Sequence, residues 1–255
     1  MQIIRLKVRG IEFGTGIPKI CVPIVAAQKE DILFQAKQIL KEQPECVELR
    51  IDWFDEVSDI DKVLELLKEL RHILKDIVLL FTFRTKREGG RRSISARDYT
   101  NLCERVCQSG NIDLIDVEAY MQDCLLYGIC ETAHRNGVYV VGSNHDFYTT
   151  SEDKEIAKRL LFMDKNGADI PKIAVTPEGP RDVLSLLSAG LLYYENGGRK
   201  PIITMSMGGQ GAISRLVGET FGSALTFATA GHISAPGQLP IDKVRSILKD
   251  LHEFQ

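Results

Sequence analysis

The stretch Gly167-Ala-Asp-Ile-Pro-Lys-Ile-Ala-Val175 predicts a short apolar strand with a lysine, Lys172, in its middle. A strand that is apolar on both faces is typical of a buried parallel sheet, where lysine is rarely found. Burying an ammonium group is costly unless the group is paired or loses its proton. A neutral amine adds to ketones and aldehydes, which is how Schiff-base lysines act. Taken alone, Lys172 is better explained as a residue at a frayed strand end whose side chain reaches water.

A strand followed by a helix recurs along the 255 residues on either side of this stretch. The predicted strands are short apolar runs: Lys19–Val25, Cys46–Asp52, Ile77–Phe83, Ile112–Glu118, Val138–Ser143, Ile170–Val175, Pro201–Ser206 and Leu225–Ala230. The predicted helices are Lys29–Glu42, Ile60–Leu74, Ala96–Cys107, Met121–Arg135, Glu152–Lys165, Arg181–Tyr194, Ala212–Phe221 and Ile241–His252. This repetition predicts an α/β fold, a closed (β/α)8 TIM barrel that forms a single domain over residues 1–255.

An N-terminal β-hairpin, Ile3–Val8 with Ile11–Phe13, precedes the first of these units. We expect the hairpin to close the bottom of the barrel. The alternative fold is a doubly wound open sheet, which would carry a glycine-rich dinucleotide-binding turn after its first strand. The segment Val25-Ala-Ala-Gln28 lacks such a turn, and this favours the barrel.

Composition narrows the class of function. The net charge of −3 gives no electrostatic argument for binding nucleic acid or an anionic membrane. No apolar run approaches the roughly 20 residues that cross a bilayer, and the first residues lack the features of a signal peptide. The six cysteines contain no Cys-x-x-Cys pair, so we expect free thiols, with a Cys/His metal site as a remote alternative. A cytoplasmic enzyme or binding protein is therefore expected.

Ionisable side chains recur where the predicted strands end. The carboxyl ends of barrel strands carry the active site, and alternate residues of a strand share a face. The inward-facing polar residues of five consecutive strands are Glu48, Arg50 and Asp52; Thr82 and Arg84; Asp116 and Glu118; Ser143 and His145; and Lys172. One charged residue in a strand carries little information, but this repetition predicts a site.

Imine catalysis is the chemistry that these side chains support. Lys172 would attack a ketone, and His145 would remove the proton next to the resulting C=N bond. Glu88 could orient the imidazole. Alone, Glu88 is better explained as a solvated loop charge among neighbouring basic residues, and His145 could equally be a helix-capping neighbour of Asp146.

Two loops at the same end of the barrel suggest how a substrate is held. The segment from Met205 to Arg215 is rich in glycine and precedes a predicted helix, an arrangement that suits an anion. Arg215 could pair with a phosphate or a carboxylate, and its position does not choose between them. The segment Gly231–Pro240 is long and polar with glycine hinges, and a lid is one interpretation of it. The other is an ordinary connector.

Six motifs together resemble the type I 3-dehydroquinate dehydratase family. They are Glu48-Leu-Arg-Ile-Asp52, Phe81-Thr-Phe-Arg84 with Glu88-Gly-Gly90, Ser143-Asn-His-Asp-Phe147, Asp169-Ile-Pro-Lys-Ile-Ala-Val175, Met205-Ser-Met207 with Ile213-Ser-Arg215, and Ser234-Ala-Pro-Gly-Gln238. The resemblance runs in order over nearly the whole chain. It implies a (β/α)8 barrel that converts 3-dehydroquinate to 3-dehydroshikimate and water in the shikimate pathway. It also implies a homodimer that uses no metal and no cofactor.

The resemblance also assigns roles to single residues. Lys172 is similar to the imine-forming lysine, His145 to the proton-transfer residue and Glu88 to the partner of that histidine. Arg215 is similar to the residue that binds the substrate carboxylate, which favours a carboxylate over a phosphate. The expected substrate-binding residues that remain are Glu48, Arg50, Arg84, Ser234 and Gln238. One departure is Pro23, which stands where some members place a serine near the substrate.

Two other functions remain as alternatives. A class I Schiff-base aldolase would share the barrel and the lysine, but His145 and the pair Glu88 and Arg215 argue against it. A catalytically silent protein that binds a metabolite and acts as a regulator would be expected to have lost the lysine or the histidine. Both residues are present.

Overall fold

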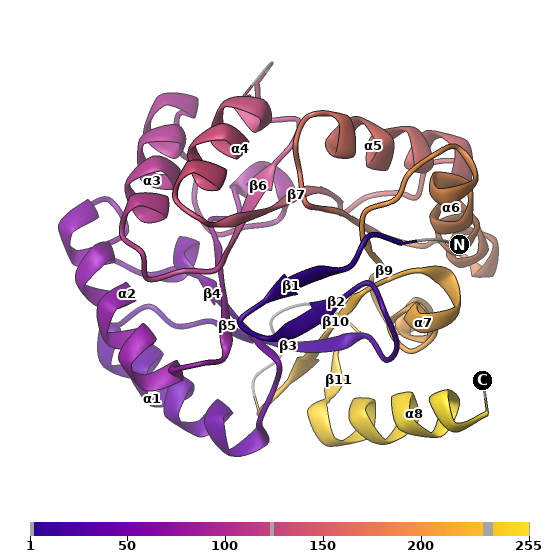
Figure 1. Ribbon diagram of the computed structural model, residues 1–255, viewed down its shortest axis with the longest axis horizontal. Coiled ribbons are helices and arrows are strands. Elements are labelled where there is room, and N and C mark those ends of the chain that lie inside the picture. Colours follow the sequence, from indigo (N-terminus) through magenta and orange to yellow (C-terminus); the bar gives the residue numbers. More distant parts are fainter. Residues whose placement is uncertain (1–2, 123–124, 232–236, 255) are drawn as a thin grey trace.

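The computed structural model describes residues 3–122, 125–231 and 237–254. Its central feature, among these residues, is a curled sheet of nine parallel strands (Figure 1). In chain order the strands are β3 (Lys19–Ile24), β4 (Cys46–Arg50), β5 (Val78–Thr82), β6 (Leu114–Glu118), β7 (Tyr139–Asp146), β8 (Ile170–Val175), β9 (Ile203–Ser206), β10 (Leu225–Thr229) and β11 (Leu239–Pro240).

The sheet closes on itself. Each strand from β3 to β8 pairs with the next one, and β10 pairs back with β3. The seam between β9 and β10 is narrow: Ala224 N–H donates to the Ile202 carbonyl at 2.8 Å, and Thr204 N–H donates to Ser223 Oγ at 3.1 Å. The short β11 lies beside β10. The predicted TIM-barrel architecture is confirmed.

Helices surround the barrel because each has one apolar face to bury. They are α1 (Lys29–Ile39), α2 (Ile60–Leu74), α3 (Ala96–Gln108), α4 (Leu125–Arg135), α5 (Asp153–Lys165), α6 (Pro180–Glu195), α7 (Gly218–Phe221) and α8 (Ile241–Glu253). In α2 the buried residues Val63, Leu66, Leu67 and Leu70 follow the helical repeat, and the Asp59 carboxylate accepts hydrogen bonds from the first turn. Among the described residues, no helix combines the length and apolar character needed to cross a membrane.

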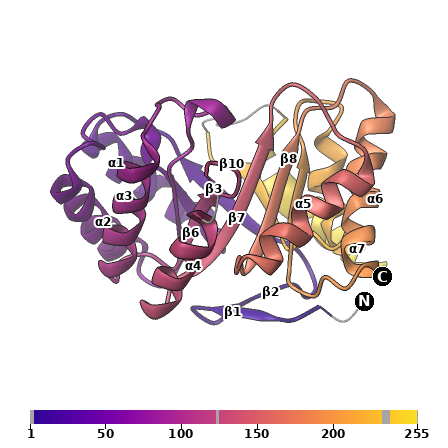
Figure 2. The ribbon, with the colours of Figure 1, turned by 90° about the horizontal axis from the view of Figure 1, so that it is seen from above.

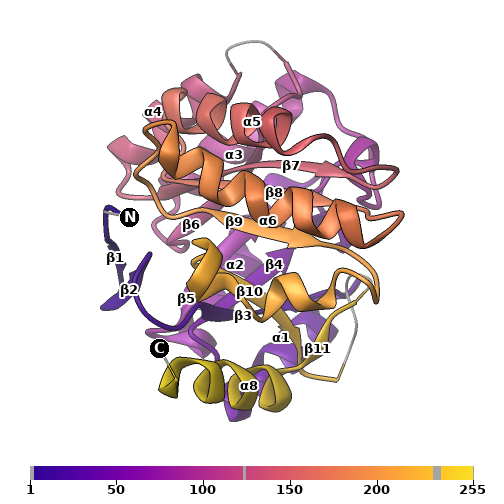
Figure 3. The same cartoon turned by 90° about the vertical axis from the view of Figure 1, so that its right-hand side faces the viewer.

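The N-terminal hairpin lies across the lower end of the barrel, as Figure 2 shows. It consists of β1 (Leu6–Val8) and β2 (Ile11–Phe13), which pair antiparallel. Val8 and Phe13 are buried in one cluster with the barrel-interior residues Val78 and Leu114. This apolar plug fills the lower half of the barrel interior, and polar side chains enter the interior at the end at which the strands finish. Figure 3 shows β1 and β2 at the end of the barrel away from β11.

Two of the differences between the predicted and the observed elements lie next to the polar end of the barrel. The predicted helix over residues 212–221 is a 3-10 helix, Ala212–Arg215, followed by the single turn α7. The chain folds back tightly here: a Cβ on Gly211 would lie 2.2 Å from the Ser206 carbonyl oxygen, so the glycine is required. The predicted strand Cys46–Asp52 ends at Arg50, because a 3-10 helix begins at Ile51. The alternation of inward and outward side chains along the strand therefore no longer applies to Asp52.

Candidate active site

One pocket opens at the carboxyl end of the barrel strands and collects the predicted site residues. Its wall includes Glu48, Arg50, Arg84, Glu88, His145, Lys172, Arg215 and Gln238. Its apolar wall is formed by Phe147, Ala174, Met205, Met207 and Phe227. Ser234, the remaining predicted site residue, lies outside the described residues. The pocket therefore brings together polar groups from β4, β7 and β8 and from the loops that follow β5, β9 and β10.

Lys172 stands in the middle of β8 and only 3% of the residue is exposed. Its Nζ donates to Asp116 Oδ2 at 2.9 Å and lies 3.9 Å from Glu48 Oε1. The Phe227 ring covers it, with 4.8 Å between Nζ and the ring centroid. The explanation of Lys172 as a frayed-end residue that reaches water is therefore wrong. The amine is held inside the pocket against a carboxylate.

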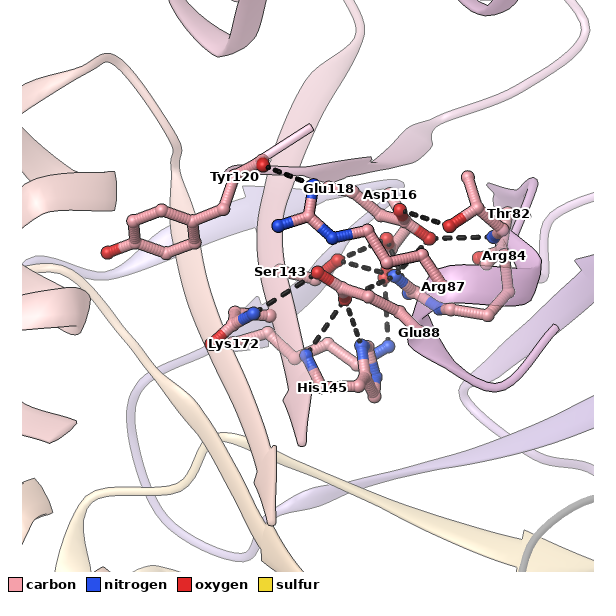
Figure 4. A network of polar contacts seen from close by, with 12 residues as sticks. Thr82, Arg84, Arg87, Glu88, Asp116, Glu118, Tyr120, Ser143, His145 and Lys172 are labelled. Atoms are coloured by element: carbon pink, nitrogen blue, oxygen red, sulfur yellow. Dashed lines mark hydrogen bonds and ion pairs between the residues drawn. The ribbon is translucent and has the colours of Figure 1, made fainter. Parts of the chain in front are cut away.

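Arg84 lies at the centre of a buried network of carboxylates (Figure 4). Its Nη2 donates to Asp116 Oδ1 at 2.7 Å, and its Nη1 donates to Glu118 Oε1 at 3.1 Å and to Ser143 Oγ at 3.0 Å. Burial favours the neutral acid at Asp116. Arg84 and Lys172 outweigh that effect and hold the pKa of Asp116 well below its usual range. The network keeps this carboxylate ionised next to Lys172.

Glu88 and His145 form a second pair in the same pocket. Glu88 Oε2 accepts a hydrogen bond from the His145 backbone N–H at 2.8 Å and lies 3.1 Å from His145 Nδ1. Asn144 Nδ2 donates to the other carboxyl oxygen at 3.1 Å. Glu88 is 5% exposed, so the interpretation as a solvated loop charge is wrong. When Nδ1 carries the proton and donates it to Glu88, Nε2 is left with a lone pair that can accept a proton in the pocket.

Burial sets the protonation of this pair. It lowers the pKa of His145 well below its usual value, and the positive charges of Arg84 and Lys172 act in the same direction. Burial also raises the pKa of Glu88 to about 7, against the opposing effect of Arg84. The imidazole is therefore neutral near pH 7 and able to accept a proton.

The other predicted binding residues reach the pocket from separate elements. Arg50 donates two parallel hydrogen bonds to Asp52, at 2.8 and 2.9 Å, which fixes its guanidinium. Glu48 Oε1 accepts from Thr82 Oγ1 at 2.9 Å. Arg215 comes from the 3-10 helix after β9 and is 2% exposed, and burial lowers its pKa to about 10. It keeps its positive charge at neutral pH.

Comparison with known proteins places this architecture in a family. Residues 20–255 match the family model described as type I 3-dehydroquinase. The chain belongs to the type I 3-dehydroquinase family. The curated 3-dehydroquinate dehydratase of Clostridioides difficile strain 630 is 46% identical over 249 residues, covering 98% of each chain. That of Listeria monocytogenes strain HCC23 is 44% identical over 249 residues, also covering 98% of each.

Solved structures of type I 3-dehydroquinases agree with the fold. A Clostridium difficile type I 3-dehydroquinate dehydratase, solved with covalent modified comenic acid, superposes with a TM-score of 0.96 at 45% identity over 100% of both chains. The Geobacillus kaustophilus 3-dehydroquinate dehydratase gives 0.95 at 38% identity, covering 99% of this chain and 98% of that one. The predicted activity is confirmed: this 3-dehydroquinase is a 3-dehydroquinate dehydratase of the shikimate pathway, EC 4.2.1.10.

The sequence placed Asp116 and Ser143 among the inward-facing residues of the 3-dehydroquinase site but predicted no role for either. Asp116 contacts both Lys172 and Arg84, and Ser143 Oγ donates to Asp116 Oδ1 at 2.6 Å. Their position near Lys172 depends on strand register: Ser143 pairs with Lys172, and Asp116 pairs with Val141 on the same strand as Ser143. That register is not visible in a single sequence.

Proposed function

We propose that this 3-dehydroquinase acts through an imine between Lys172 and the ring ketone of 3-dehydroquinate. The observation that carries the proposal is the position of Lys172, whose amine is buried in the pocket wall together with His145. A primary amine and a neutral imidazole in one pocket are the two groups that imine formation and removal of the adjacent proton need. The solved Clostridium difficile relative with covalent modified comenic acid is consistent with covalent chemistry in this family.

The first half of the reaction uses Lys172 and then His145. The ammonium group of Lys172 gives a proton to the ketone oxygen, the resulting amine attacks the ketone carbon, and the oxygen leaves as water to give a protonated C=N bond. The positive charge of the protonated imine acidifies the C–H bond on the neighbouring carbon. His145 Nε2 removes that proton, and the C–H electron pair forms an enamine. Glu88 holds the imidazole through the 3.1 Å contact at Nδ1.

The second half returns the enzyme to its starting state. The enamine expels the β-hydroxyl group, which takes the proton held by His145 and leaves as water. A water molecule then hydrolyses the product imine and frees Lys172. Two waters leave and one enters, so the balance is the loss of one water from 3-dehydroquinate. No electrons are exchanged with another molecule.

Four of the predicted binding residues are proposed to hold the substrate directly. Arg215 is assigned to the carboxylate, while Glu48, Arg50 and Gln238 are assigned to hydroxyl groups and lid closure. Ser234 keeps the lid role that the family resemblance implies. Arg84 differs because its guanidinium already donates to Asp116, Glu118 and Ser143. We assign it to holding the carboxylates in place.

Assembly, domain organisation and location are proposed from family membership and the sequence. We propose a homodimer acting in the cytoplasm, each chain being a single domain over residues 1–255. Light scattering of the purified enzyme would report the mass of the assembly directly.

Chemical trapping tests the imine. Borohydride added during turnover reduces a C=N bond to a stable amine, so the enzyme should be inactivated and gain the mass of one substrate-derived group. Intact-mass measurement followed by peptide mapping should place that mass on the peptide that contains Lys172. Borohydride without substrate serves as the control and should leave both mass and activity unchanged. An enzyme that keeps full activity in the presence of substrate and borohydride would contradict the proposal.

Arg215→Ala tests the carboxylate contact. A charge-assisted hydrogen bond to a buried carboxylate contributes about 1.5–3 kcal/mol. The KM for 3-dehydroquinate should therefore rise roughly 10- to 150-fold. Arg245→Ala is a matched control, because Arg245 donates to the carbonyls of Glu42 and Gln43 and lies outside this pocket. A variant at Arg215 with unchanged KM and reduced kcat would show that the carboxylate contact belongs to another residue.

A further inference from the structure

The two oxygens of the Asp116 carboxylate have different partners. Oδ1 accepts hydrogen bonds from Arg84 Nη2 at 2.7 Å and from Ser143 Oγ at 2.6 Å. Oδ2 accepts from Lys172 Nζ at 2.9 Å. Asp116 is 1% exposed, and Arg84 and Lys172 are each 3% exposed. Two donors on Oδ1 therefore fix the carboxylate in one orientation, and that orientation points Oδ2 at the Lys172 nitrogen.

Asp116 is poorly suited to accept a proton from Lys172. A carboxylate that accepts bonds from a guanidinium and a hydroxyl is stabilised in its ionised form. The pKa of Asp116 is held far below neutrality by Arg84 and Lys172 in spite of its burial. Asp116 therefore remains an anion throughout the reaction.

We propose that Asp116 is the fixed counter-ion of the imine nitrogen and keeps that nitrogen protonated while His145 moves protons on the carbon skeleton. The inference deepens the imine mechanism proposed above and rests on it. An ammonium ion and a ketone give an iminium ion and water, so the nitrogen carries one positive charge before and after condensation. One N–H bond remains, and it donates to Asp116 Oδ2. The protonated imine is the form that accepts the C–H electron pair.

The other groups facing Lys172 are less suited to this task. The titratable and charged side chains around it, apart from Asp116, are Glu48 and Arg50 on β4, Arg84 and Glu88 after β5, His145 on β7, Cys21 on β3 and Arg215 after β9. Glu48 is a full ångström farther from Nζ, at 3.9 Å, and is assigned to the substrate. Burial raises the pKa of the Cys21 thiol and lowers that of the His145 imidazole, so both are neutral. Asp116 is the nearest anion in this set.

Asp116→Asn removes the charge and keeps the size of the side chain. Arg84 keeps Glu118 and Glu88 as partners, at 3.1 and 3.3 Å, so its own charge stays compensated. Loss of an anion at this distance lowers the pH at which the imine loses its proton by about 1–3 units. In a plot of kcat against pH, the alkaline limb should shift to lower pH by that amount. Trapping by cyanoborohydride, which reduces the protonated imine, should fall about tenfold or more at alkaline pH and recover towards acid pH.

Asp113→Asn is the matched control. Asp113 also carries a buried carboxylate, paired with Arg9 and Arg71 at 2.6 Å each, but it lies just before β6 at the lower end of the barrel. Its replacement should leave the alkaline limb where it is in the parent. An Asp116→Asn profile that matches the parent, while the parent is still trapped on Lys172, overturns the inference and leaves the imine mechanism intact. Failure to trap the parent overturns the imine mechanism itself.

If Asp116→Asn does not fold, a second measurement tests whether the imine nitrogen stays protonated. The parent enzyme labelled with ¹⁵N-lysine is mixed with 3-dehydroshikimate, and the imine nitrogen is observed by NMR. The expected result is a nitrogen that still carries its proton across the alkaline range in which the enzyme is active. A neutral imine as the main species in that range would overturn the inference.

Discussion

Lys172→Ala is expected to abolish turnover and to leave no adduct after treatment with substrate and borohydride. The reason is that the alanine side chain carries no nucleophile, and other amines on the surface cannot place a nitrogen at the same point of the pocket. Removing the nucleophile of a covalent mechanism costs several orders of magnitude in kcat, as the loss of single catalytic groups in other enzymes shows. Appearance of the enone absorbance of 3-dehydroshikimate measures turnover, and intact mass measures the adduct.

Lys200→Ala provides the comparison for Lys172→Ala. Lys200 is also partly buried and ion-paired, with Nζ 3.2 Å from Asp164 Oδ1, but it lies outside the pocket. Its variant should keep both turnover and the trapped adduct. Thermal unfolding of both variants separates a chemical effect from a loss of folding. A Lys172→Ala protein that is still labelled by substrate and borohydride would place the imine on another lysine.

The fold was largely predictable because the sequence repeats one pattern. Short apolar strands and amphipathic helices alternate, and each pair adds a similar unit to the barrel. The prediction failed where local close contacts override the repeat. Gly211 lets the chain approach the Ser206 carbonyl, and this close approach replaces the long helix expected there with a 3-10 helix. Such contacts depend on the folded backbone, so the hydrophobic pattern does not reveal them.

The site was predictable as a set and less so residue by residue. Strand alternation correctly placed Glu48, Arg50, Arg84 and Lys172 on the inner face. Strand alternation did not predict that Asp116 contacts Lys172, because this contact depends on the register of β6 against β7 and β8. Register arises from packing between strands that are distant in the sequence.

Glu88 shows most clearly which part of the site could not be predicted from the sequence. Its sequence neighbours, mostly basic and glycine residues, favour a solvated loop. The structure buries it because the loop folds back sharply: a Cβ on Gly90 would lie 1.8 Å from the Arg84 carbonyl oxygen. Gly89 has a φ of +82°, a conformation that favours glycine, and the Phe147 ring lies against it. These two glycines allow the turn that brings Glu88 to the backbone N–H of His145. The local sequence pattern does not predict this contact.

The second large effect is expected for His145→Ala, and it differs in kind from that of Lys172→Ala. The variant keeps its nucleophile, so it should still form an imine that borohydride traps on Lys172. It loses the base for C–H removal and the acid for hydroxide departure, and each role contributes roughly 10²–10⁴ in rate. The two losses need not multiply, because both act through one imidazole. Turnover should therefore become negligible while the imine with 3-dehydroquinate accumulates.

The structure indicates that His145→Ala removes the imidazole and leaves the position of Glu88 unchanged. The backbone N–H of residue 145 donates to Glu88 Oε2 at 2.8 Å, and this bond survives the loss of the imidazole. Glu88 should thus stay in place, and the change is confined to the missing ring. His134→Ala is the control, because His134 pairs with Asp169 at 2.8 Å outside the pocket and should keep parent activity. Slower trapping in His145→Ala is acceptable, since an imidazole can also assist imine formation. Normal turnover by this variant would assign proton transfer to another residue, and an untrappable variant would tie His145 to the covalent step itself.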